Sequence, residues 1–124
     1  MILCVVDDLI FSVKISTAAR AVGAETYFER NPEMVLARIR EKRPALVIFD
    51  LNGTKLHPLE TIAAMKSDPG LRTIRTLGYV SHVQTDVINA ARTAGIDEVL
   101  ARSAFSDRLG QILTTPPTKS GEQD

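Results

Sequence analysis

The stretch at residues 2–8 reads ILCVVDD, five apolar residues followed directly by two acidic ones. A second stretch, at residues 45–50, reads ALVIFD and also ends on an acidic residue, Asp50. Apolar runs this short and this rich in β-branched residues are typical of strands buried on both faces. If the two strands are parallel neighbours, their carboxyl ends share one edge of a sheet, where open α/β sheets keep their binding sites. The pattern therefore predicts that Asp7, Asp8 and Asp50 converge at that edge, where their repulsion would favour a cation such as Mg²⁺.

The rest of the chain alternates between strand-like and helix-like segments, which favours a parallel sheet covered by helices on both faces. The expected strands lie at about residues 2–6, 25–29, 45–50, 75–80 and 97–101. Four of the five expected helices have a marked start or stop: one ends at Gly23, one begins at Asn31-Pro32, one is capped by Thr85-Asp86, and the last begins near Ala104. Polar side chains cap the free amides at a helix start, proline fits the first helical position, and glycine can adopt the positive φ that ends a helix.

Composition limits what kind of protein this is. The 124 residues are 44% hydrophobic and 24% charged, with 15 basic and 15 acidic side chains, so the formal net charge is zero. We expect one domain over residues 1–114, a disordered tail over 115–124, no direct nucleic-acid or membrane binding, and a cytoplasmic location. The single cysteine, Cys4, lies in an expected strand and is read as a buried inert thiol.

At this point the sequence resembles the receiver domain of two-component response regulators. The resemblance rests on the two acidic stretches, on Ser81 after the fourth strand, and on Ala94-Gly95 before the fifth. It implies a flavodoxin-like (βα)₅ fold whose five-stranded parallel sheet has the order 2-1-3-4-5. It also implies site roles: Asp50 as phosphoacceptor; Asp7, Asp8, Asp50 and the carbonyl of Asn52 as Mg²⁺ ligands; and Ser81 and Arg102 as phosphoryl-sensing residues.

The sequence departs from the pattern of that family at several places. Arg102-Ser103 stands where the family has Lys-Pro, His82 stands where a small residue leaves the phosphoryl donor a path, and Val99 replaces a common aromatic. Without proline, we expect a trans bond between Arg102 and Ser103, with Ser103 capping the last helix. Residues 9–11, Leu-Ile-Phe, are unusually apolar; two of the three are expected in the core and one on a partner surface.

Several side chains also have a simpler structural interpretation. Asp7 and Asp8 could cap the first helix rather than bind metal. Arg102 could form an ion pair with Asp50 rather than contact a phosphoryl group, and Ser81 could be an ordinary hydroxyl at the end of a strand. His82, a possible gating residue, and His57 could both be loop histidines.

Three functions compete at this stage. The leading one is a stand-alone, non-enzymatic receiver that takes a phosphoryl group at Asp50 from a histidine kinase or phosphotransfer protein and signals to a protein target, as a monomer or weak homodimer. The second is a degenerate receiver that acts as a phosphorylation-independent interaction module. The third, an enzyme or small-ligand binder, is disfavoured because the loop after the first strand has no glycine-rich phosphate cradle.

Overall fold

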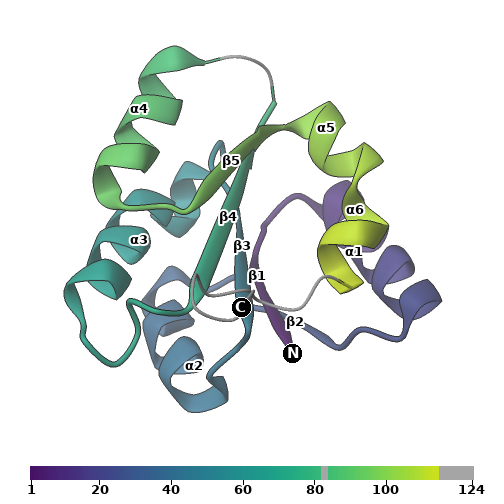
Figure 1. The fold of residues 1–124 in the computed structure, drawn as a ribbon, viewed down its shortest axis with the longest axis horizontal. Coiled ribbons are helices and arrows are strands. Elements are labelled where there is room, and N and C mark those ends of the chain that lie inside the picture. The colour runs from purple at the N-terminus through teal and green to yellow at the C-terminus, as the bar shows by residue number, and fades with distance from the viewer. Residues whose placement is uncertain (82–83, 115–124) are drawn as a thin grey trace, which may run out of the picture.

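A computed structural model of the chain describes residues 1–81 and 84–114. Its centre is one parallel sheet in the order β2-β1-β3-β4-β5, as Figure 1 shows. The strands are β1 (Ile2–Val5), β2 (Thr26–Phe28), β3 (Leu46–Asp50), β4 (Arg75–Val80) and β5 (Glu98–Ala101). The predicted strand order and fold class are thus confirmed. The predictions for residues 115–124 and for His82 concern positions outside the described residues.

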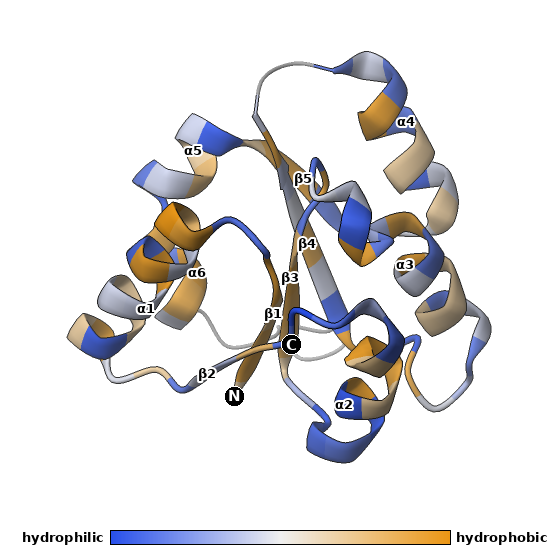
Figure 2. Ribbon diagram, turned by 180° about the vertical axis from the view of Figure 1, so that it is seen from behind, coloured by the Kyte–Doolittle hydropathy of each residue, from blue (hydrophilic) through white to orange (hydrophobic). Residues whose placement is uncertain are grey.

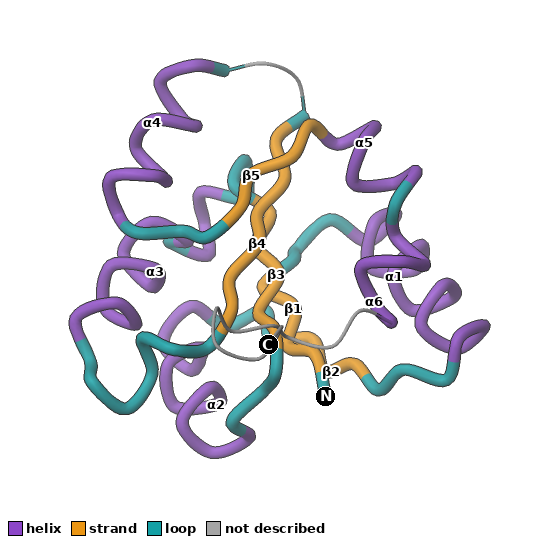
Figure 3. Tube along the Cα trace, in the orientation of Figure 1, coloured by secondary structure: helices purple, strands orange, loops and turns teal. Residues whose placement is uncertain are grey.

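Helices cover both faces of the sheet. They are α1 (Leu9–Val22), η1 (Pro32–Met34), α2 (Val35–Lys42), η2 (Thr54–Leu56), α3 (Pro58–Ser67), α4 (Thr85–Ala94), α5 (Arg102–Asp107) and α6 (Leu109–Thr114). In Figures 1 and 3, α2, α3 and α4 lie on one side of the sheet and α1, α5 and α6 on the other. None of the helices in the described part of the chain is long and apolar enough to cross a membrane.

Most helix ends follow the predicted signals, but the starts of α4 and α5 differ. Gly23 and Gly95 both adopt positive φ, at 75° and 107°, and close α1 and α4 as expected. The Asn31 side chain accepts a hydrogen bond from the Glu33 amide at 3.0 Å and caps η1. The predicted cap at Thr85-Asp86 is wrong, because Gln84 is the cap residue and both residues already lie in the first turn of α4. There the helix dipole favours the carboxylate of Asp86.

The start of α5 differs from the prediction. The helix begins at Arg102, ahead of the expected Ala104, and its cap residue is Ala101. Ala101 is extended, at φ −63° and ψ 150°, and leads from β5 into the helix without an intervening loop. Ser103 therefore lies inside the first turn and cannot cap the helix, so that prediction is wrong. The bond between Arg102 and Ser103 is trans, as predicted, and the described residues contain no cis peptide bond.

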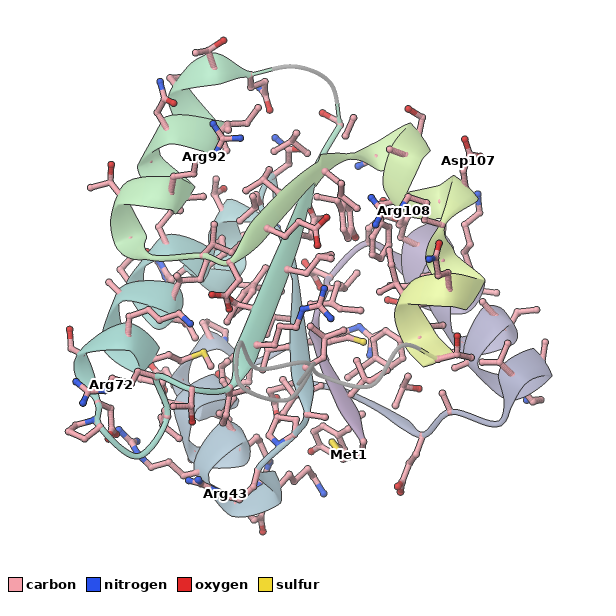
Figure 4. All side chains as sticks on the ribbon, in the orientation of Figure 1. Met1, Arg43, Arg72, Arg92, Asp107 and Arg108 are labelled. Atoms are coloured by element: carbon pink, nitrogen blue, oxygen red, sulfur yellow. The ribbon has the colours of Figure 1, made fainter. Side chains whose placement is uncertain are left out.

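The last helix is also divided in two, at Arg108. Its backbone departs from helical geometry there, at φ −100° and ψ 9°, although the Arg108 amide still donates to the Ala104 carbonyl at 3.0 Å. The side chain of Arg108, labelled in Figure 4, places Nη1 3.6 Å from Oε2 of Glu98 in β5. This ion pair links the junction of α5 and α6 to the edge strand.

Each face of the sheet has its own hydrophobic core, and the central strands β1 and β3 are mostly orange in Figure 2. Alternate residues of β1 show the division: Leu3 and Val5 pack under α2 and α3, whereas Ile2 and Cys4 pack under α1 and α6. Cys4 is fully buried, and burial raises the pKa of its thiol to about 12. The prediction of an inert thiol is confirmed, because a thiol that stays protonated is a poor nucleophile.

Candidate functional site

Asp50 ends the central strand β3 and is almost completely buried, at 5% exposure. Its Oδ1 accepts a hydrogen bond from the Asn52 amide at 3.0 Å, which fixes the carboxylate. A Cβ on Gly53 would lie 3.5 Å from Oδ2, so glycine at this position keeps the approach to that oxygen open. Burial raises the pKa of Asp50; the Asn52 amide and the charge of Arg102 oppose the shift, and the charge of Asp8 adds to it.

The two acidic residues after β1 have different roles. Asp8 is the cap residue of α1, and its Oδ1 accepts hydrogen bonds from the amides of Ile10 and Phe11 at 2.9 and 3.3 Å. Asp7 is exposed. In the described ranges, no three His, Cys, Asp or Glu side chains are grouped to hold a metal ion. The predicted grouping of all three carboxylates is therefore not found in the described residues, whereas Asp8 lies close enough to Asp50 to affect its pKa.

Arg102 lies at the same edge, at the first position of α5. Its ion pair is with Asp8, whose Oδ2 is 4.0 Å from Arg102 Nη2, and not with Asp50, which was one of the two alternatives for this residue. The guanidinium carbon lies 5.0 Å from the centroid of the Phe11 ring, within the range of a cation–π interaction. Its charge also opposes the rise in the pKa of Asp50, so the one guanidinium stabilises the charged forms of both carboxylates.

Asn52 joins two loops of the site through its side chain, which the sequence did not indicate. Its Oδ1 accepts a hydrogen bond from the Ser81 amide, and its Nδ2 donates to Oε1 of Gln84, both at 2.6 Å. The half-buried Ser81 is thereby held beside the loop that follows Asp50. The Asn52 carbonyl, the predicted metal ligand, accepts a hydrogen bond from the Thr54 amide at 3.0 Å and keeps a second lone pair.

His57 is not part of this arrangement. Its Nδ1 lies 3.4 Å from Oε2 of Glu60, and both side chains are mostly exposed. His57 immediately precedes α3 and has a positive φ of 51°. The simpler interpretation, a loop histidine, describes it well.

Three stacked aromatic rings lie beneath the carboxylate edge, and sequence reasoning missed them as a unit. Tyr79 of β4 stacks on Phe105 at 4.6 Å between centroids and makes a tilted contact with Phe11 at 5.0 Å. Tyr79 is fully buried and is the register partner of Asp50 across β3 and β4. Burial raises the pKa of its hydroxyl, and the charges of Asp50 and Asp8 raise it further. Strand alternation, which places Tyr79 on the same face as Leu77, was the signal available in the sequence.

The donor set suits a hard divalent cation. Asp8, Asp50 and the Asn52 carbonyl are oxygen donors, and Mg²⁺ typically binds through one or two carboxylates and keeps several waters. Two facing carboxylates are therefore enough for a weak site, although Asp8 has only one oxygen free of the helix cap. Any cation that binds there shares the site with the guanidinium of Arg102.

An apolar surface lies next to the acidic residues, at the start of α1. Leu9, Ile10 and Val13 are 70%, 76% and 57% exposed, whereas Phe11 is buried. The expectation that two of residues 9–11 belong to the core is thus wrong: two are exposed. The cause is helical spacing, since Phe11 faces the sheet together with Ile15, and Leu9 and Ile10 lie on the outer side of the turn.

Comparison with known proteins shows which solved structures share this fold. No protein-family model matches the sequence, and no curated protein matches it. Among solved structures, the phosphorylated cyanobacterial phytochrome response regulator RcpA is 26% identical, with a TM-score of 0.77 over 90% of this chain and 86% of that one. A response regulator from Hahella chejuensis is 18% identical, with a TM-score of 0.81 over 90% of each chain. The Mn²⁺-bound form of response regulator Rcp1 is 19% identical, with a TM-score of 0.78 over 94% of this chain and 98% of that one.

These matches span almost the whole of both chains. The protein therefore has the fold of a response regulator receiver domain, as the sequence resemblance implied.

Proposed function

We propose that this chain is a signalling receiver that accepts a phosphoryl group at Asp50 and passes the signal on through protein contacts, in the cytoplasm and without catalytic output of its own. The observation that carries the proposal is the placement of Asp50. It is a buried, oriented carboxylate at the carboxyl end of the central strand, beside Asp8 and Arg102, in a fold shared with response regulators.

The chemistry is a transfer between two nucleophiles. Oδ2 of Asp50 attacks the phosphorus of a phosphohistidine, an O–P bond forms, the N–P bond breaks, and the imidazole leaves with the electron pair. A Mg²⁺ ion held by Asp8, Asp50 and the Asn52 carbonyl would neutralise charge on the transferring oxygens. The Asn52 amide holds Asp50 in place throughout, and Ser81 and Arg102 would contact the product phosphoryl oxygens.

The proposal is tested by incubating the protein with acetyl phosphate and Mg²⁺ and measuring intact mass. We expect one added phosphoryl group in the wild type and none in Asp50→Asn. Asp7→Asn, which changes an exposed carboxylate at the same edge, should still be labelled. Labelling that persists in Asp50→Asn would assign the acceptor to another residue and contradict the proposal.

The exposed apolar surface formed by Leu9, Ile10 and Val13 fits the phosphodonor protein in this proposal. It adjoins Asp8 on one helix, so a protein that covers it also covers the edge at which Asp50 lies. Contiguous exposed apolar side chains commonly mark protein interaction sites.

Ile10→Glu should therefore slow phosphoryl transfer from a protein donor by about tenfold or more, the scale of a central interface residue. The assay follows transfer from the autophosphorylated histidine kinases of the source organism, each in turn. Labelling by acetyl phosphate should be unchanged, because it needs no docking surface. Val22→Glu is the matched control, since Val22 is an exposed valine at the other end of α1. Equal loss with both donors would show that the substitution damages the site rather than docking.

The second candidate function, a phosphorylation-independent interaction module, is favoured by one observation. Arg102 Nη2 lies 4.0 Å from Asp8 Oδ2, so the carboxylate edge has a cation of its own. If acetyl phosphate and Mg²⁺ leave the mass of the wild type unchanged, this function replaces the first.

A further inference from the structure

Arg102 occupies the one part of Asp8 that a cation could use. The Oδ1 atom of Asp8 is taken by the amides of Ile10 and Phe11, which leaves Oδ2 as its free oxygen. The guanidinium of Arg102 faces that oxygen at 4.0 Å, with its side chain about one-third exposed. A metal ion that binds Asp8 has to approach the same atom.

The guanidinium of Arg102 contacts an aromatic ring on one face, but its Nε has no hydrogen-bond partner among the described residues. It lies over the Phe11 ring, 5.0 Å from the centroid, and this stacking suits a planar cation. Its Nε, however, is buried without a hydrogen-bond partner among the described residues. No backbone or side-chain acceptor among the described residues therefore fixes this edge of the guanidinium. Its partial exposure gives it a way out to solvent, where Nε regains water.

A second unpaired group lies at the same place. Tyr79 is fully buried, and its hydroxyl and the Arg102 Nε are the two buried side-chain atoms without a partner in residues 1–81 and 84–114. Tyr79 is also the register partner of Asp50 and stacks on the ring that carries Arg102. Buried polar groups are normally satisfied, and their occurrence together marks a site whose full set of partners includes something besides the protein, such as a water or a ligand.

We propose that Arg102 is a built-in competitor of the divalent cation: its guanidinium neutralises Asp8 at rest and must leave Oδ2 before a metal ion can bind there. The inference rests on the proposed function, because it concerns the cation that phosphoryl transfer to Asp50 would use. It makes Arg102 the residue that sets metal affinity at this edge. A positive charge next to a cation site is repulsive, and the ion pair with Asp8 adds the cost of its own release.

The test is a Mg²⁺ titration followed by the amide NMR signals of residues 7–9 and 50–53. Arg102→Gln should bind Mg²⁺ about tenfold more tightly than the wild type, equivalent to about 1.4 kcal/mol. Arg108→Gln is the matched control. This substitution removes a partly exposed arginine that pairs with Glu98 rather than with Asp8. The Mg²⁺ affinity of Arg108→Gln should therefore stay within about twofold of the wild type.

A double-mutant cycle separates competition at Asp8 from a general change of charge. In an Asp8→Asn background, Arg102→Gln should lose its advantage, because the contested oxygen no longer carries the charge. An unchanged or weaker affinity in Arg102→Gln, a full advantage in the Asp8→Asn background, or no Mg²⁺ binding by any variant would each overturn the inference. Failure of the proposed function is distinguished by acetyl phosphate: a protein that binds Mg²⁺ as described but takes no phosphoryl group keeps this inference and loses that function.

Discussion

Phe11→Ala lowers the free energy of unfolding by about 3–5 kcal/mol, the usual cost of removing a buried aromatic ring. Phe11 is 6% exposed, and its ring contacts those of Tyr79 and Phe105 at centroid distances of 5.0 and 6.1 Å. The substitution also removes the surface on which Arg102 stacks. The expected loss is measured by urea unfolding followed by circular dichroism.

The adjacent residue supplies the control for that experiment. Ile10 lies on the same helix turn and is 76% exposed, so Ile10→Ala should change the free energy of unfolding by no more than about 0.5 kcal/mol. Similar losses for the two variants would contradict the assignment of Phe11 to the core and Ile10 to the surface.

Asp50→Asn stabilises the metal-free protein at neutral pH. Burial and the charge of Asp8 raise the pKa of Asp50, which means that its ionisation opposes folding. Asparagine keeps an oxygen to accept the hydrogen bond of the Asn52 amide and carries no charge. We expect the Tm to rise by several degrees, since about 1 kcal/mol corresponds to roughly 3–6 °C for a domain of this size. Asp7→Asn, at an exposed position, should leave the Tm nearly unchanged.

The pH dependence of this effect has a definite sign. Because the pKa of Asp50 is higher in the folded state than its unfolded value of about 3.9, the folded state binds more protons between those two pKa values. The contribution of Asp50 is least unfavourable below the unfolded pKa and becomes fully unfavourable as pH rises through the folded pKa. The advantage of Asp50→Asn should therefore be larger at pH 7 than at pH 4, as measured by urea unfolding. An advantage that shrinks with rising pH would show that Asp50 is stabilised as a carboxylate.

The strands could be predicted because each carries its own signal. The runs at 2–6 and 45–50 are apolar on both faces, which only a strand in the middle of a two-layered core tolerates, and Gly23 and Gly95 stop helices by adopting positive φ. The start of α5 could not be predicted in the same way. Whether Arg102 continues β5 or begins a helix depends on how Ala101 leaves the sheet, and that is set by tertiary packing.

The sequence predicted which residues lie at the site better than it predicted the hydrogen bonds and ion pairs that they form. Asp8 and Asp50 meet because parallel strands bring their carboxyl ends to one edge, and that much follows from topology. That Asp8 caps α1 while Asp7 is exposed does not follow from topology, because it depends on which of the two residues the chain turns back over. The partner of Arg102 and the side-chain bonds of Asn52 likewise depend on loop paths that no local pattern encodes.

The ring cluster next to Asp50 also gives the molecule an optical signal of its own. The chain has two tyrosines and no tryptophan, so excitation beyond the absorption band of phenylalanine reports on Tyr27 and Tyr79 alone. Tyr27 lies in β2, partly exposed, with the Lys42 ammonium 4.4 Å from its ring, whereas Tyr79 is sealed next to Asp50. In a Tyr27→Phe protein the tyrosine emission therefore originates from Tyr79 in the strand next to Asp50, and events at the Asp50 carboxylate become visible without any attached dye.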